Sequence, residues 1–217
     1  MKWSLKREIF PLVVMAVLLV FALYRYSGLP DPMPSHFDAE GNINGWMGKA
    51  VFMWMMAGLT LGLYLLITFL PLIDPLWRKI EPRYGLILLI RDVVIGFLAF
   101  VFVLTIIGAG EGRLLSELLG VGLGVLFILM GNYMPKLPQN WFVGIRSPWT
   151  LSSDVIWRKT HVLGGWLFAL CGVVFIICSL LRMPLVIPLV SIIATAIVTG
   201  VIYPLYLFKK LPKADGT

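Results

Sequence analysis

Six apolar stretches, each long enough to cross a lipid bilayer, constrain the fold of this chain more than any other feature of its sequence. A transmembrane α-helix needs about 20 consecutive, mostly apolar residues. Because a backbone inside lipid must satisfy its own hydrogen bonds, these stretches are expected to be helices and not isolated strands. The predicted spans cover about residues 9–27, 50–73, 86–110, 115–134, 162–181 and 184–208.

The composition supports a single membrane domain over residues 1–217. Hydrophobic residues make up 59% of the chain and charged residues 13%, with a mean hydropathy of +0.92, whereas soluble domains contain about 25% charged residues. Six spans take up about 120 residues, and the remainder is too divided to form a soluble domain of ordinary size. We therefore predict an all-α fold, an integral membrane bundle of six transmembrane helices.

The distribution of basic residues predicts the orientation of the bundle. Thirteen lysines and arginines fall on the side that holds both termini and the second and fourth connections, and four fall on the other side. Short cytoplasmic loops carry the excess of Lys and Arg, so both termini are expected in the cytoplasm. The net charge of +7 then reflects membrane anchors, and we expect no direct nucleic-acid partner.

The connection over residues 28–49 is predicted to form a hairpin-like cap outside the membrane. Prolines at positions 30, 32 and 34 favour an extended entry, and two turn-rich segments follow. Alternating oxygens from Asp38 onward resemble a calcium loop, but its sixth and twelfth positions hold Ile43 and Lys49 in place of Gly and Glu. We therefore expect no calcium there. His36 and Trp46 either line a binding surface or pack the folded cap.

The connection over residues 132–161 is predicted to be a cytoplasmic loop rich in tryptophan and arginine. Pro148 precedes Thr150–Asp154, whose hydroxyls and carboxylate suit a helix N-terminus. Trp157 and His161 are four residues apart and share one face of that helix. Arg146 suits a bidentate contact to Asp154, to a lipid phosphate or to an acidic partner. The loop is thus either an interfacial segment anchored at the headgroups or a docking surface for a ligand or cytoplasmic partner.

Arg91 and Asp92 lie at or inside the third span, where ionisable groups are costly. If that helix begins near Arg91, both lie at the membrane interface. If it begins near Tyr84, they lie about 10 Å deep and must pair inside the bundle. Neighbouring residues on a helix do not face each other, so each is expected to have a different partner. We predict that one of them makes a charged contact with the 132–161 loop.

Residues that could carry catalysis or bind a metal are scarce. His36 and His161 fall on opposite sides of the membrane, so a site with two histidine ligands cannot form within one chain. Cys171 and Cys178 are about 10 Å apart along one helix, too far for a disulfide between them. The sequence contains no Gly-rich phosphate loop and no nucleophile elbow. We predict no enzyme activity, no metal and no cofactor.

Two motifs resemble those of the SdpI family of bacterial membrane proteins. The 132–161 loop contains NWFVGIRSPWTL, an acidic residue and a W-x-x-T-H pattern, with Ser147 at a position where Thr is commoner. The 28–49 loop contains LPDPMPSHF followed by G-x-x-N-G. The resemblance covers essentially the whole chain. It indicates as candidate site residues Asn140, Gly144, Arg146, Pro148, Trp149, Thr150, Asp154, Trp157, Thr160 and His161 in the inner loop, and His36, Phe37, Gly41, Asn44 and Lys49 in the outer loop.

The resemblance implies a plasma-membrane protein that gives immunity to a secreted peptide toxin, the sporulation-delaying protein. It also implies that the protein sequesters a small transcriptional repressor at the membrane when toxin is bound. The expected partners are membrane lipid, the peptide toxin and the cytoplasmic repressor. The alternative function is a small transporter or channel-like protein for a hydrophobic or peptide substrate. The spans offer few polar groups to line such a path, and they lack paired helix breaks in two halves.

Overall fold

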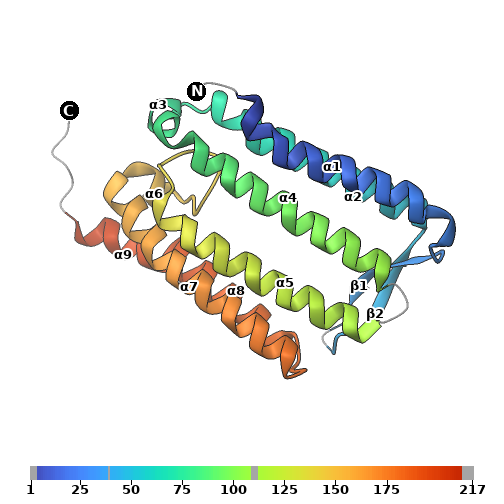
Figure 1. Ribbon diagram of the computed structural model, residues 1–217. Helices are drawn as coiled ribbons and strands as arrows, with labels where there is room; N and C mark the ends of the chain where they lie inside the picture. The colour runs from blue at the N-terminus through green and yellow to red at the C-terminus, as the bar shows by residue number, and fades with distance from the viewer. Residues whose placement is uncertain (1–3, 39, 109–111, 212–217) are drawn as a thin grey trace.

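The computed structural model describes residues 4–38, 40–108 and 112–211 and consists mainly of long helices (Figure 1). Within these ranges six helical segments are long and apolar enough to cross a membrane, which confirms the predicted number of spans. Five are continuous, and the last is interrupted by a π-helical turn. They are α1 (Leu5–Arg25), α2 (Lys49–Phe69), α4 (Tyr84–Ile107), α5 (Gly112–Tyr133), α7 (Asp154–Leu180), and the succession of α8 (Val186–Ile197), η5 (Val198–Ile202) and α9 (Tyr203–Lys210).

Short elements fill the connections between the spans. The outer connection forms two antiparallel strands, β1 (Met33–Phe37) and β2 (Ile43–Met47), which confirms the predicted hairpin. The remaining elements are short helices: η1 (Tyr26–Gly28), η2 (Leu70–Leu72), α3 (Trp77–Ile80), η3 (Glu81–Arg83), η4 (Met134–Lys136) and α6 (Pro148–Ser152).

The first five spans begin earlier than predicted: α1 begins at Leu5 instead of about residue 9, and the shifts of α4 and α7 bear on the charged and polar residues. The helix of the third span, α4, begins at Tyr84, so Arg91 and Asp92 lie about two turns inside it and not at its start. Helix α7 begins at Asp154 instead of residue 162, because Ser153 accepts a hydrogen bond from the Ile156 N–H at 3.4 Å and caps a polar first turn. The end predicted for the third span, residue 110, lies outside the described residues.

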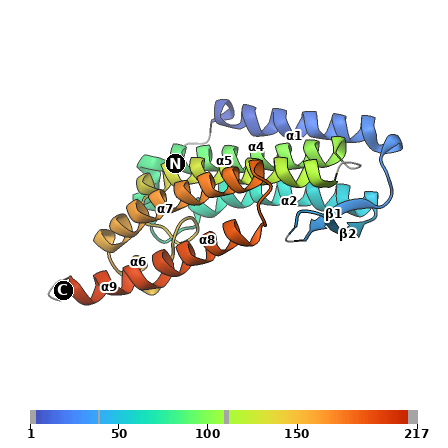
Figure 2. The same ribbon diagram turned by 90° about the horizontal axis from the view of Figure 1, so that it is seen from below.

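The spans form a bundle with α4 and α5 in the middle (Figure 1). Helices α1 and α2 pack against α4 on one side, and α7 packs against α5 on the other, with α8 next to α7. Figure 2 shows α1 on one face of the bundle and α8 and α9 on the opposite face. Helix α1 begins and α9 ends at the end of the bundle that holds α3 and α6, whereas the β1–β2 hairpin lies at the other end.

The outward faces of the helices are apolar. Trp54 in α2 is 79% exposed and Trp166 in α7 is 76% exposed, and leucine, isoleucine and valine side chains cover much of the remaining helical surface. In water such a continuous apolar surface would drive association, whereas lipid tails solvate it. The surface therefore agrees with a protein that crosses a membrane several times.

Glycines bring α5 and α7 into close contact. A Cβ built on Gly124 would lie 2.6 Å from the carbonyl oxygen of Gly172, and one built on Gly131 would lie 2.5 Å from the carbonyl oxygen of Gly165. Small residues at such crossings let two backbones approach, which is how helices associate in lipid without a hydrophobic driving force. The α5–α7 pair is therefore the backbone-to-backbone core of the bundle.

Candidate functional site

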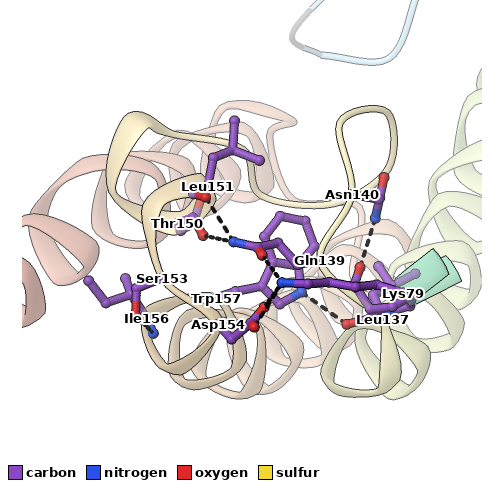
Figure 3. A network of polar contacts seen from close by, with 11 residues as sticks. Lys79, Leu137, Gln139, Asn140, Thr150, Leu151, Ser153, Asp154, Ile156 and Trp157 are labelled. Atoms are coloured by element: carbon purple, nitrogen blue, oxygen red, sulfur yellow. Dashed lines mark hydrogen bonds and ion pairs between the residues drawn. The ribbon is translucent and has the colours of Figure 1, made fainter. Parts of the chain in front are cut away.

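The segment between α5 and α7, residues 134–153, is held against the rest of the bundle by Lys79 of α3. The Lys79 ammonium donates to Gln139 Oε1 at 2.7 Å and to the Asp154 carboxylate at 2.7 and 2.8 Å. Gln139 in turn donates from Nε2 to the carbonyl oxygens of Thr150 and Leu151 at 3.0 and 2.9 Å, at the end of α6. Figure 3 shows this network, in which Lys79 joins α3, the 134–153 segment and the start of α7.

Asn140 organises the tight turn at the start of the NWFVGIR motif. Its side-chain oxygen accepts from the N–H groups of Phe142 and Val143, and its side-chain amide donates to the carbonyls of Pro138 and Val143, all at 2.6–2.9 Å. The side chain is buried, and every hydrogen-bonding position is used, as a buried amide requires. The role of Asn140 in this structure is to hold the turn.

The SPWT part of the motif caps α6. Ser147 Oγ accepts from the Thr150 N–H, and Thr150 Oγ1 accepts from the Ser147 N–H, which together form a capping box. Thr150 Oγ1 also donates to the Ile145 carbonyl, at 2.9 Å. Pro148 occupies the first turn of α6, where its missing N–H has no partner to lose.

His161 joins the 134–153 segment to α7. Its Nε2 accepts from the Ile145 N–H at 3.0 Å and its Nδ1 lies 2.8 Å from the Trp157 carbonyl oxygen, so the ring is neutral and carries its proton on Nδ1. The rings of Trp157 and His161 stack with centroids 4.0 Å apart, which confirms that they share a face. Gly144 has φ +112°, and a Cβ on it would lie 2.5 Å from His161 Nε2. Only glycine fits there.

Of the three partners considered for Arg146, the pairing with Asp154 is not the one observed. The Arg146 guanidinium is exposed and donates to the Trp141 carbonyl oxygen at 2.7 Å. Asp154 pairs instead with Lys79, which α3 brings in from a different connection of the chain. Arg146 therefore keeps most of its donors free of the contacts that hold the fold.

The other candidate residues of the inner loop divide by exposure. Thr160 is fully buried, and its hydroxyl has no hydrogen-bond partner among the described residues. Trp149 is half-buried. The exposed side chains include one tryptophan and three basic residues: Trp141, Arg146, Arg158 and Lys159. Basic side chains of this kind can contact lipid phosphates or an acidic protein partner.

Arg91 pairs inside the bundle and not with the inner loop, so the predicted contact is wrong. Its Nη1 lies 2.7 Å from Glu8 Oε2 and 3.0 Å from Thr68 Oγ1, and its Nη2 donates to the Arg7 carbonyl oxygen at 2.7 Å. The start of α4 at Tyr84 places the guanidinium between α1 and α2, within reach of these groups. The alternative in which the pair lies deep and pairs internally is the one observed.

Arg91 and Asp92 also contact each other, against the expectation of separate partners. Arg91 Nε lies 3.0 Å and Nη2 2.9 Å from Asp92 Oδ1. The spacing rule concerns the directions of the Cβ atoms, and the long arginine side chain folds back across its own helix. Glu8, missed in the sequence because it precedes the first apolar run, completes the cluster and also accepts from the Tyr64 hydroxyl at 2.9 Å. The sequence did contain a signal for this contact: Glu8 is an acidic residue at the edge of the first span, and Arg91, inside another span, needs an acidic partner.

The candidate residues of the outer loop build the hairpin and attach it to the bundle. His36 faces Gly45 across the strands, where a side chain on Gly45 would collide with the histidine. Gly41, at φ +85°, packs against Ser116 of α5. The Lys49 ammonium lies 4.9 Å from the centre of the Tyr26 ring.

Two further candidates of the hairpin differ in exposure. Phe37 pairs with Ile43 and is half-buried, whereas Asn44 is exposed. Trp46 is 53% exposed beside them. The hairpin is thus a packed cap with an exposed aromatic and polar face.

The described residues contain no group of three or more His, Cys, Asp or Glu side chains that could hold a metal ion. Cys171 and Cys178 are buried free thiols, and Cys171 Sγ lies 3.1 Å from Thr195 Oγ1.

Comparison with known proteins gives a consistent result. Residues 136–206 match the model of the SdpI/YfhL protein family, and residues 13–61 match a domain of unknown function (DUF1648). The chain is 20% identical to the immunity protein SdpI of Bacillus subtilis (strain 168) over 209 residues, which are 95% of this chain and 98% of that protein. No solved structure matches. With its two loop motifs and six membrane-spanning helices, the chain is a multi-pass membrane protein that is similar to the SdpI/YfhL family.

Proposed function

We propose that this chain is a membrane immunity protein that protects a bacterium against a secreted peptide toxin. The observation that carries the proposal is the similarity to the immunity protein SdpI, which extends over 95% of this chain and 98% of that protein. A match of that extent includes both terminal regions and both long connections. It therefore favours a shared role over a shared scaffold alone, although the identity is 20%.

We place the chain in the bacterial plasma membrane, with both termini and the 134–153 segment in the cytoplasm. The excess of Lys and Arg in one set of short connections supports this orientation. Under it the β1–β2 hairpin faces outward, where a secreted toxin arrives. The exposed ring of Trp46 and the exposed amide of Asn44 offer that toxin an aromatic and hydrogen-bonding contact.

The cytoplasmic end is proposed to hold a small repressor when toxin is bound outside. Arg146, Arg158 and Lys159 are exposed there, and they suit an acidic partner surface because charge complementarity steers association. Helices α5 and α7 connect the two ends: Gly41 of the hairpin packs on α5, and His161 fixes the inner segment to α7. Their tight glycine contacts make them suited to move as one unit.

The proposal is tested in Bacillus subtilis cells that lack their own SdpI protein. Cells that express this chain should survive the sporulation-delaying peptide toxin at doses that kill cells with an empty vector. Trp46→Ala should lower that survival without lowering membrane abundance. The matched control is Trp54→Ala, which removes an exposed tryptophan from the lipid-facing side of α2. Killing equal to the empty vector, with the wild-type chain present in the membrane, would contradict the proposal.

A further inference from the structure

A groove on the side of the bundle runs along α4 and α5, and one residue of α1, Phe10, also lines it. Its volume is about 670 Å³, and its walls include Phe10 of α1, Gly96 and Phe100 of α4, and Val125 and Leu129 of α5. The lining is apolar except for one acidic residue, Asp92. All three helices are membrane spans, so the groove opens toward lipid and not toward water.

Asp92 gives the groove one polar end. The residue lies eight positions inside α4, about 12 Å from its start, and Phe100 lies about 12 Å farther along. Arg91 pairs with both Asp92 and Glu8, so Asp92 lies at the same depth in the bundle as Glu8 in the first turns of α1. The groove therefore begins near the end of the bundle where α1 begins and runs into the hydrocarbon layer.

The charges at this end favour a cation. Glu8 and Asp92 carry two carboxylates against the single guanidinium of Arg91, which leaves one formal negative charge in the cluster. Glu8 is buried, whereas the Asp92 side chain is 23% exposed and lines the groove. Lys6 and Arg7, both exposed on the first turn of α1, offer cations for a phosphate close to the same level.

The lining of the groove favours an apolar occupant along most of its length. The α5 wall from Leu118 to Leu129 is twelve residues long and spans about 16 Å. An extended acyl chain is a narrow apolar rod that can lie along Gly96 and Val125.

We propose that this groove is a binding site for a phospholipid with a primary amine in its headgroup, with one acyl chain along α4 and α5 and the ammonium next to Asp92. The site is distinct from the hairpin and from the inner segment. It does not depend on the immunity function, because a bound lipid here would fix α1 to α5 whatever the chain protects against.

The test is native mass spectrometry of the purified full chain, given equal amounts of phosphatidylethanolamine and phosphatidylglycerol with matched acyl chains. The wild-type chain should retain phosphatidylethanolamine over phosphatidylglycerol. Asp92→Asn should abolish the headgroup preference and still retain lipid. Val125→Trp should fill the groove and lower the retention of both lipids. The matched control is Val173→Trp on α7, because Val173 is 44% and Val125 46% exposed.

Equal retention of the two lipids by the wild-type chain would overturn the proposal, as would equal lipid loss from Val125→Trp and Val173→Trp. Thermal unfolding of Asp92→Asn in detergent shows whether that variant is folded, and Val125→Trp tests the groove independently of the charge cluster. Displacement of the lipid by added toxin peptide, together with loss of protection in Val125→Trp cells, would instead assign the groove to the peptide. Lipid retention is measured without toxin, so its failure leaves the immunity proposal standing.

Discussion

Arg91 Nη1 and Glu8 Oε2 lie 2.7 Å apart with 0% and 2% of their side chains exposed, and this pair joins α4 to α1. Helix α1 buries only Glu8 and Pro11 of its described side chains, so most of its surface is left to lipid. The ion pair is consequently the main polar attachment of α1 to the bundle.

Loss of the Glu8 carboxylate should destabilise the chain strongly. Glu8→Ala leaves Arg91 buried without its principal partner, and breaking a buried ion pair costs about 3–5 kcal/mol. The comparison is Asp154→Ala, which breaks the exposed Lys79–Asp154 pair and should cost about 1 kcal/mol or less. Thermal unfolding of both variants in detergent measures the difference, and equal losses would mean that the buried pair does not anchor α1.

Substitution of Gly124 should separate α5 from α7. Gly124→Ala gains about 1 kcal/mol of helix propensity, but its Cβ would lie 2.6 Å from the backbone oxygen of Gly172, which cannot move as a side chain can. We expect a lower melting temperature and lower membrane abundance. Gly62→Ala in α2, where nothing lies within 4 Å of the new Cβ, should be neutral or stabilising. A Gly124→Ala protein as stable as the Gly62→Ala control would show that the two backbones are not in contact.

Gly144→Ala should loosen the 134–153 segment. A residue other than glycine at φ +112° is strained by about 1–3 kcal/mol, and the added Cβ would meet His161 Nε2. Limited proteolysis of the segment and thermal unfolding should both report the loss, with Gly85→Ala at the exposed start of α4 as the control. In a His161→Ala background the effect should shrink, because residues in contact are not additive. If the losses of stability from Gly144→Ala and His161→Ala were fully additive, the two residues would not be in contact.

Arg146→Lys should leave membrane abundance and melting temperature near those of the wild type. The exposed guanidinium makes one hydrogen bond, to the Trp141 carbonyl oxygen, and a lysine ammonium can replace it. A bidentate contact to a partner cannot be replaced in this way. If Arg146 docks the repressor, reporter output should fall at normal abundance. A loss of abundance equal to that of Gly144→Ala would assign Arg146 to the fold instead.

Much of the fold could be predicted from the sequence because its determinants are local. Six apolar runs identify the spans, proline and turn residues identify the β1–β2 hairpin, and the four-residue spacing of Trp157 and His161 places them on one face. Helix ends were less accurate: α7 extends beyond its apolar run because Ser153 caps a polar first turn outside it.

The partners of the charged side chains could not be predicted, since they come from distant parts of the chain. Arg91 meets Glu8 across 83 positions and Lys79 meets Asp154 across 75. Such pairs depend on which helices become neighbours. Helix packing is in turn set by contacts such as Gly124 on Gly172. Those glycines recur along α5 and α7 at spacings that a search for small-residue interfaces would have detected.

The proposed roles of both ends depend on the orientation of the bundle, because the toxin is assigned to the hairpin end and the repressor to the end that holds α6. Asn42 and Ser152 are exposed at these two ends, so single cysteines can be placed there in a chain in which both buried native cysteines, Cys171 and Cys178, are replaced by alanine. A membrane-impermeant maleimide applied to intact cells should label Asn42→Cys and spare Ser152→Cys, with both labelled after the membrane is opened. Labelling of Ser152→Cys but not Asn42→Cys in intact cells would contradict the orientation and, with it, the proposed roles of both ends.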